Sequence, residues 1–204
     1  MARIDDYYNA KKITAESLAG KSLDRIGETS GFSIKEGNTI IVPFLNRTYN
    51  VSFPDFSFMD ADAPEKEVPI AEQVLILHYL SAMSDIEPFG EWIAYREIPG
   101  AAFYYSAFVK RAADPAKKVF GENLDAFHAA ALKIDGKRIE DGDAGYEFQI
   151  FPKVPLRVII WEGDDEFEAS ANILFDKSAG NFLSPEDAAW LAGMVIYRLA
   201  ALSR

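Results

Sequence analysis

The sequence predicts an α+β fold in which helices pack against a mainly antiparallel sheet, within a single domain spanning residues 1–204. Two observations support this class. Stretches rich in β-branched and aromatic residues occur early and late in the chain. Stretches with helical periodicity lie between them and at the end, which differs from the regular β-α alternation of parallel sheets. The same order is also compatible with two lobes.

The first half of the chain contains two helical stretches on either side of a β-rich one. Apolar residues recur at roughly helical spacing before Gly27, which is a suitable stop. From Phe32 the composition favours strands, with turns formed by glycine and asparagine. The expected elements are a helical segment within residues 1–30, a three-stranded antiparallel meander at 32–53, an acidic solvated connection at 55–69 and a buried helix at 68–83.

The second half is expected to alternate between short helices and a second strand-rich region. Asp114 and Pro115 indicate a new helix start, and Ser184 followed by Pro185 indicates another. The expected elements are a strand at 91–98, helical segments at 101–114, from 115 and at 124–134, a loop at 136–145, two or three strands within 146–176 and a terminal helix to about Leu202.

The acidic composition argues against nucleic acid and anionic membranes as partners. The chain has 32 acidic and 21 basic residues, and no run of basic residues is longer than the pairs Lys110–Arg111 and Lys117–Lys118. The N-terminus carries acids where a signal peptide has its apolar core, and no apolar run approaches the roughly 20 residues that span a bilayer. We therefore expect a cytoplasmic protein whose partner is another protein or a small-molecule ligand.

Several classes of chemistry are excluded by what the sequence lacks. Cysteine is absent, so this chain cannot hold a disulfide, a thiolate zinc site, a cysteine nucleophile or a cysteine-ligated iron–sulfur cluster. The two histidines, His78 and His128, have no second histidine or carboxylate at the spacing of a helical zinc pair. Glycine-rich phosphate loops and the G-x-S-x-G motif are also missing.

The stretch Glu162–Glu168 packs five carboxylates between two apolar stretches. Crowded carboxylates repel one another, raise each other's pKa and can be neutralised by Ca²⁺ or Mg²⁺. The alternative is a solvated hairpin tip, because turns favour Asp and Gly and the EF-hand spacing is missing. A second acidic loop at 140–143 would lie nearby if its flanking strands paired with these. The candidate metal ligands are Asp164, Asp165, Glu166 and Glu168.

An aromatic group with one arginine forms the other candidate site. Aromatic rings beside a guanidinium can line a pocket for a flat anionic ligand, although such rings more often pack in the core. His78 adds an axial ligand or proton donor to this hypothesis. The candidate ligand-binding residues are Trp92, Tyr95, Arg96, Tyr104 and His78.

The wording of several stretches resembles a known family. These stretches are VLILHYL, GEWIAYREIPGAAFYYSAF, FPKVPLRVIIWEGDDEFEASANILFD and LSPEDAAWLAGM. The chain resembles, from about Phe32 onward, an uncharacterised family of anaerobic bacteria and archaea, catalogued as domain of unknown function 3786. We take residues 31–204 as the family-like region. Some relatives are named as iron–sulfur proteins through a cysteine-rich module that this chain lacks. The resemblance implies an accessory or ligand-binding role in an anaerobe, in the setting of corrinoid and one-carbon metabolism.

Three functional hypotheses follow. The first is a non-enzymatic accessory or ligand-binding protein. The second is a divalent-metal-dependent enzyme of the hydrolase type that uses the acidic hairpin at 162–168. The third is a structural or protein-interaction domain for which the acidic surface is sufficient.

Overall fold

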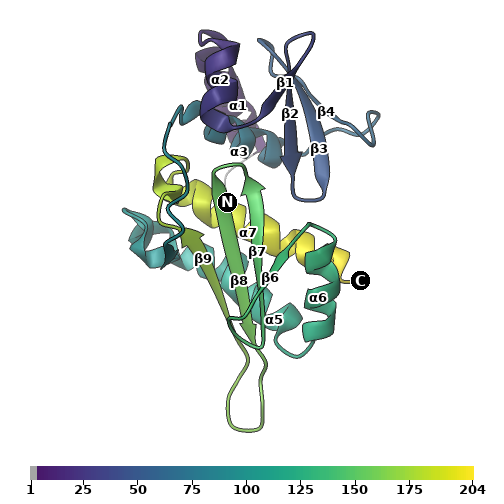
Figure 1. Cartoon of the computed structure of the whole chain (residues 1–204), viewed down its shortest axis with the longest axis vertical. Coiled ribbons are helices and arrows are strands. Elements are labelled where there is room, and N and C mark those ends of the chain that lie inside the picture. Colours follow the sequence, from purple (N-terminus) through teal and green to yellow (C-terminus); the bar gives the residue numbers. More distant parts are fainter. Residues whose placement is uncertain (1–3) are drawn as a thin grey trace. The chain divides into compact units, whose positions relative to one another are not determined.

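The computed structural model describes residues 4–204, which form helices and two antiparallel sheets (Figure 1). This arrangement confirms the α+β class. The chain divides into two compact units, and each contains one of the sheets. Unit 1 comprises Met1–Ile86 and Asn181–Leu183, and unit 2 comprises Glu87–Gly180 and Ser184–Arg204. No helix within residues 4–204 combines the length and apolar character needed to cross a membrane.

Unit 1 combines three helices with a four-stranded antiparallel meander. The predicted buried helix is confirmed, because α3 is buried along most of its length and packs against α1. Its Tyr79 hydroxyl donates a hydrogen bond of 2.5 Å to the carbonyl oxygen of Ser30. The elements are α1 (Ile4–Ala19), α2 (Leu23–Ser30), β1 (Ser33–Lys35), β2 (Thr39–Phe44), β3 (Arg47–Ser52), β4 (Phe58–Asp60) and α3 (Ile70–Ser81), with sheet order β1-β2-β3-β4.

Strand β4 corrects the prediction that residues 55–69 form only a solvated connection. Asp60 pairs in register with Tyr49 of β3, and its carboxylate is buried beside the Arg47 guanidinium at 3.1 Å. A paired carboxylate can be buried at much lower cost than an isolated one. The fourth strand therefore tolerates an acidic residue at a position where the sequence pattern predicts exposure.

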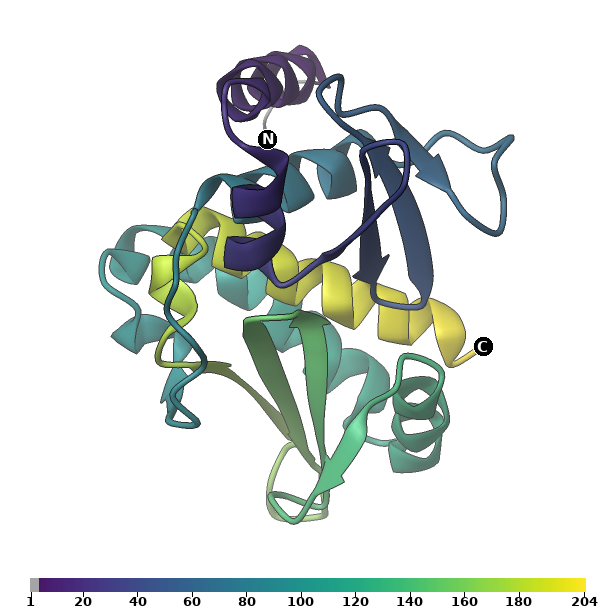
Figure 2. The same ribbon diagram turned by 45° about the horizontal axis from the view of Figure 1, so that its top comes forward.

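Unit 2 is built on a five-stranded antiparallel sheet. Helices α5 and α6 pack against β7, β8 and β9, and α7 packs against α4, α5 and α6, so the helices cover one face of the sheet (Figures 1 and 2). The elements are β5 (Trp92–Ala94), α4 (Tyr105–Phe108), α5 (Asp114–Phe120), α6 (Leu124–Leu132), β6 (Lys137–Ile139), β7 (Ala144–Phe151), β8 (Val154–Trp161), β9 (Ser170–Asp176) and α7 (Pro185–Leu202), with sheet order β5-β9-β8-β7-β6.

Three predictions in this unit need correction. The strand expected at 91–98 ends at Ala94, because Ala94 donates its amide to the Glu97 carboxylate and a 3₁₀ turn follows. The expected loop at 136–145 contains the edge strand β6. No new helix is capped by Asp114, since the helical path runs on from α4 through a π-helical turn at Val109–Ala113. Pro115 has no amide hydrogen to donate, and the wider turn before it accommodates the missing bond.

The terminal helix begins as predicted, with Ser184 as its N-cap. The Ser184 hydroxyl oxygen accepts the amide hydrogen of Asp187 at 3.1 Å, and the hydroxyl donates to the Asp187 carboxylate at 2.7 Å. Ser184→Ala is expected to lower the free energy of unfolding by about 1 to 2 kcal/mol, because one amide in the first turn loses its acceptor. Urea denaturation followed by tryptophan fluorescence measures this change in unit 2, which contains Trp92, Trp161 and Trp190.

Candidate functional site: the acidic hairpin

The acidic stretch is the connection between β8 and β9, and it projects beyond the ends of these strands (Figures 1 and 2). Trp161 pairs with Ser170 as the last residues in register, so the connecting loop covers residues 162–169. The predicted order of buried strand, acidic turn and second strand is confirmed. The second strand, β9, starts at Ser170, so Phe167 lies in the loop, where it is 71% exposed.

Asp164 organises the tip of the loop. Its Oδ1 accepts the amide hydrogens of Phe167 at 2.7 Å and Glu166 at 2.8 Å, and its own amide donates to the Phe167 carbonyl oxygen at 2.9 Å. These bonds favour the ionised carboxylate and hold the pKa of Asp164 below its ordinary value. The prediction that the crowded carboxylates raise each other's pKa is therefore wrong for Asp164.

The loop is anchored to the C-terminal end of α5. The Gly163 amide donates to the Gly121 carbonyl oxygen at 3.1 Å, and the Lys117 ammonium contacts the Glu168 carboxylate at 2.5 Å. The ion pair lowers the pKa of Glu168, which again opposes the prediction from crowding. A Cβ on Gly121 would lie 2.4 Å from the Ala169 Cβ, so this close approach requires glycine.

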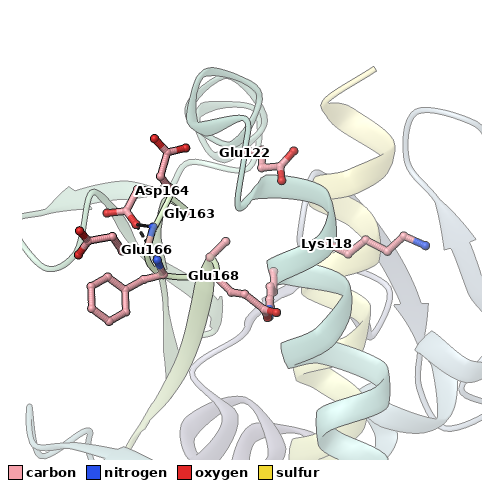
Figure 3. Close-up of a pocket in the computed structure, with 10 residues that line it drawn as sticks. Lys118, Glu122, Gly163, Asp164, Glu166 and Glu168 are labelled. Carbon is pink, nitrogen blue, oxygen red and sulfur yellow. Dashed lines mark hydrogen bonds and ion pairs between the residues drawn. The ribbon is translucent and has the colours of Figure 1, made fainter.

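The loop and α5 enclose an open hollow of about 730 Å³ (Figure 3). Figure 3 shows Glu168 directed toward α5, Glu166 directed away from it, and Lys118 pointing away from the hairpin. Five of the lining residues are acidic and two are lysines, so the wall is predominantly negative. The lining residues are Lys117, Lys118, Glu122, Gly163, Asp164, Asp165, Glu166, Phe167, Glu168 and Ala169.

The second acidic loop lies beside the hairpin, as the pairing of the flanking strands predicts. The Asp143 carboxylate accepts the amide hydrogen of Glu162 at 2.8 Å, and Asp141 forms an ion pair of 3.6 Å with Arg157. Asp143 therefore holds the backbone at Glu162, and Asp141 holds the Arg157 side chain. Among residues 4–204, no cluster of three or more His, Asp or Glu side chains is arranged to hold a metal ion.

A family model matches residues 22–198. The chain belongs to this family, described as Domain of unknown function (DUF3786). The match starts ten residues before the resemblance noted in the sequence and includes the whole hairpin. No curated protein and no solved structure matches the chain.

The predicted aromatic site is distributed differently in this DUF3786 chain. Tyr95 belongs to the core: its ring stacks on Phe108 with centroids 4.3 Å apart, and its hydroxyl donates to the Pro185 carbonyl oxygen at 2.7 Å. Burial, followed by the charges of Tyr104 and Glu186, raises the pKa of Tyr95 to about 12. The phenol is therefore neutral and engaged with the backbone near neutral pH.

Arg96 and Trp92 are each packed against a residue outside the predicted set. The Arg96 guanidinium lies 3.6 Å from the centroid of the Tyr105 ring, and the Arg157 guanidinium lies 4.0 Å from the centroid of the Trp92 ring. Tyr104 is half-buried in the 3₁₀ turn before α4. His78 lies on α3 of unit 1, whereas the other four candidates belong to unit 2. None of the five lines the hollow at the hairpin.

Sequence reasoning missed the residues that α5 and its C-terminal turn contribute to the site of this DUF3786 chain. Lys117, Gly121 and Glu122 lie far from the hairpin in sequence, and a lysine on a helix carries no signal of its ion-pair partner. Arg157 was also missed, although it joins Trp92, Asp141 and Glu147. The one usable signal was Gly121, because glycine often ends a helix and a helical segment was predicted from 115.

The hydrogen bonds to Asp164 predict a pH-dependent loop. A carboxyl group whose pKa is lowered by folding stabilises the folded loop above its unfolded pKa, and this contribution is lost as the pH falls through the folded pKa. We expect the NMR titration midpoint of Asp164 to lie below that of the same residue in a peptide spanning 160–171. The Phe167 amide should also lose protection from exchange as Asp164 is protonated. Identical midpoints in protein and peptide would contradict this account.

Proposed function

We propose that this chain is a non-enzymatic binding domain whose acidic hairpin accepts a cationic, partly apolar segment of a partner protein. The observation that carries this proposal is the hollow between the hairpin and α5, with its predominantly acidic wall. Asp165 and Glu122 contribute carboxylates to its lining, Glu166 adds a carboxylate on the side of the hairpin that faces away from α5, and the exposed Phe167 ring adds an apolar contact (Figure 3). A negative concave surface attracts cations, and an exposed aromatic residue in it supplies an anchor for binding.

The positive charge in the hollow does not offset this wall. The Lys117 ammonium is already neutralised by Glu168, and Lys118 points away from the hairpin (Figure 3). An open hollow of about 730 Å³ can hold a few extended side chains, such as lysine or arginine flanked by apolar residues. The loop is also preorganised by Asp164 and by the Gly163–Gly121 bond, which reduces the entropy lost on binding.

The other hypotheses receive less support. Of the four predicted metal ligands, Asp164 caps the loop backbone and Glu168 is paired with Lys117, so a divalent cation would compete with both interactions. A corrinoid or another flat ligand bound at the aromatic group would have to displace Arg96 from Tyr105 or Arg157 from Trp92. The protein-interaction hypothesis uses the carboxylates and the exposed ring as they stand.

Site-specific photo-cross-linking in the native host tests this proposal. A photoreactive phenylalanine analogue at position 167 should give a cross-linked partner, and cross-linking should decrease when Asp165 and Glu166 are replaced by Asn and Gln. The matched control is position 103, since Phe103 is 94% exposed in the same unit but lies outside the hollow. Equal cross-linking at positions 167 and 103 would reject the proposal. Undiminished cross-linking at position 167 in the variant with Asp165 and Glu166 neutralised would reject it as well.

A further inference from the structure

Unit 1 contains a second hollow, of about 340 Å³, between α1 and the turn that follows β3. One face of α1 supplies most of its wall, because Tyr8, Lys12, Ala15 and Ala19 follow one another at helical spacing. Pro54 closes the other side. Ala15 and Ala19 leave space that larger side chains would fill, so the hollow results from small residues on this face of α1.

Two adjacent lysines meet this hollow in different environments. Lys12 is 72% exposed, and its ammonium lies 4.0 Å from the Glu16 carboxylate one turn later. Lys11 is half-buried, and its ammonium lies 5.6 Å from the centroid of the Phe58 ring. Burial lowers the pKa of Lys11, and the negative charge of Glu67 only partly offsets this effect. Lys11 therefore presents more neutral amine than an ordinary surface lysine.

We propose that Lys11 is an acylation site, which accepts a short-chain acyl group from an activated donor of the acyl phosphate or thioester class. The hollow beside Lys11 offers an apolar wall of Ala15, Ala19 and Pro54 against which a short acyl chain can pack. The neighbouring Lys12 ammonium supplies a positive charge for the anionic leaving group. Neither feature depends on the acidic hairpin of unit 2.

The reaction is a simple acyl transfer. The neutral Nζ of Lys11 attacks the acyl carbon, a carbon–nitrogen bond forms, and the bond from this carbon to the phosphate oxygen or the thiolate sulfur breaks. The phosphate or thiolate leaves with the electron pair, and the nitrogen loses its proton to water. The product is an amide without charge, which removes the cation from beside the Phe58 ring.

The test treats the full-length folded protein with acetyl phosphate, and separately with an acetyl thioester of a small thiol. Fragmentation of the peptide from Tyr7 to Glu16 resolves acetylation at the two adjacent lysines. The initial rate at Lys11 is expected to exceed that at Lys12 by at least about threefold with one or both donors, since buried amines carry more of the reactive neutral form. Equal rates, or a faster rate at Lys12 with both donors, would overturn the proposal.

Two variants test the role of the hollow. Ala15→Leu fills it with a residue that favours helix, and it should reduce the Lys11 rate to that of Lys12. Ala15→Ser leaves the hollow open and should keep the preference. If Ala15→Leu does not fold, as judged by circular dichroism, Ala19→Leu fills the same space from the next turn. An undiminished preference for Lys11 in a folded Leu variant would also overturn the proposal.

Discussion

Asp176→Ala is expected to lower the free energy of unfolding of unit 2 by about 3 to 5 kcal/mol, the largest loss among the substitutions considered. The buried Asp176 carboxylate accepts backbone amide hydrogens from Phe89 at 2.9 Å, Gly90 at 2.7 Å and Ser178 at 2.9 Å. These bonds hold the segment before β5 against β9, where Trp92 pairs with Asp176. Alanine would leave three amides without their charged acceptor.

The same interaction predicts a pH dependence. Burial alone raises the pKa of Asp176, but the hydrogen bonds from Ser178, Phe89 and Gly90 outweigh it and hold this pKa below the ordinary value. The stabilisation is therefore complete above the unfolded pKa and is lost as the pH falls through the folded pKa.

Urea denaturation with tryptophan fluorescence measures both effects, and the exposed Asp165→Ala serves as the control. Asp176→Asn retains one oxygen acceptor and should lose less stability than alanine. A loss below about 1 kcal/mol for Asp176→Ala would contradict this role, because surface substitutions commonly fall within that range.

Gly121→Ala is expected to separate the hairpin from α5. The backbone of Gly121 is right-handed helical, with φ of −65°, so alanine is conformationally acceptable there. The new Cβ would instead lie 2.4 Å from the Ala169 Cβ and 2.5 Å from the Lys117 carbonyl oxygen. Relief of this overlap is expected to cost about 1 to 3 kcal/mol and to break the Gly163–Gly121 hydrogen bond.

Urea denaturation measures the loss of stability in Gly121→Ala. Hydrogen exchange at the Gly163 amide measures the loss of the Gly163–Gly121 hydrogen bond. Gly180→Ala is the matched control, because its added Cβ meets neighbours only at 3.9 Å or beyond. If the Gly163 amide is equally protected from exchange in the Gly121→Ala and Gly180→Ala variants, the close approach at Gly121 does not hold the hairpin against α5.

Local patterns carried much of the fold prediction. The Ser184 cap, the buried α3 and the β8–β9 hairpin follow from residues that are adjacent in sequence, so the pattern alone predicts them. The short strands β4 and β6 were missed because three residues carry little periodicity, and their pairing depends on β3 and β7. Strand pairing of this kind is decided by the neighbouring strand rather than by composition.

The candidate site likewise combines features that the local sequence predicts with features that depend on contacts between distant residues. The sequence identified the acidic loop, but its ionisation is governed by contacts that the sequence does not display: two backbone amides at Asp164 and the Lys117 ammonium at Glu168. The hollow exists because Gly121 and Gly163 permit a close approach between α5 and the hairpin. Crowding of carboxylates was therefore an insufficient guide to their pKa values.

Equilibrium binding of a labelled peptide of lysine, arginine and leucine tests the central claim most directly. Fluorescence anisotropy should detect binding to the unmodified protein at low salt, with affinity that falls as salt screens the acidic wall. Glu122→Gln, Asp165→Asn and Glu166→Gln combined should weaken binding at least about tenfold. The matched control neutralises three exposed acids of unit 1, with Asp24→Asn, Glu36→Gln and Glu65→Gln, and should leave the affinity nearly unchanged. Equal weakening by both triple variants would show that net charge alone attracts the peptide, and would contradict a binding site at the hairpin.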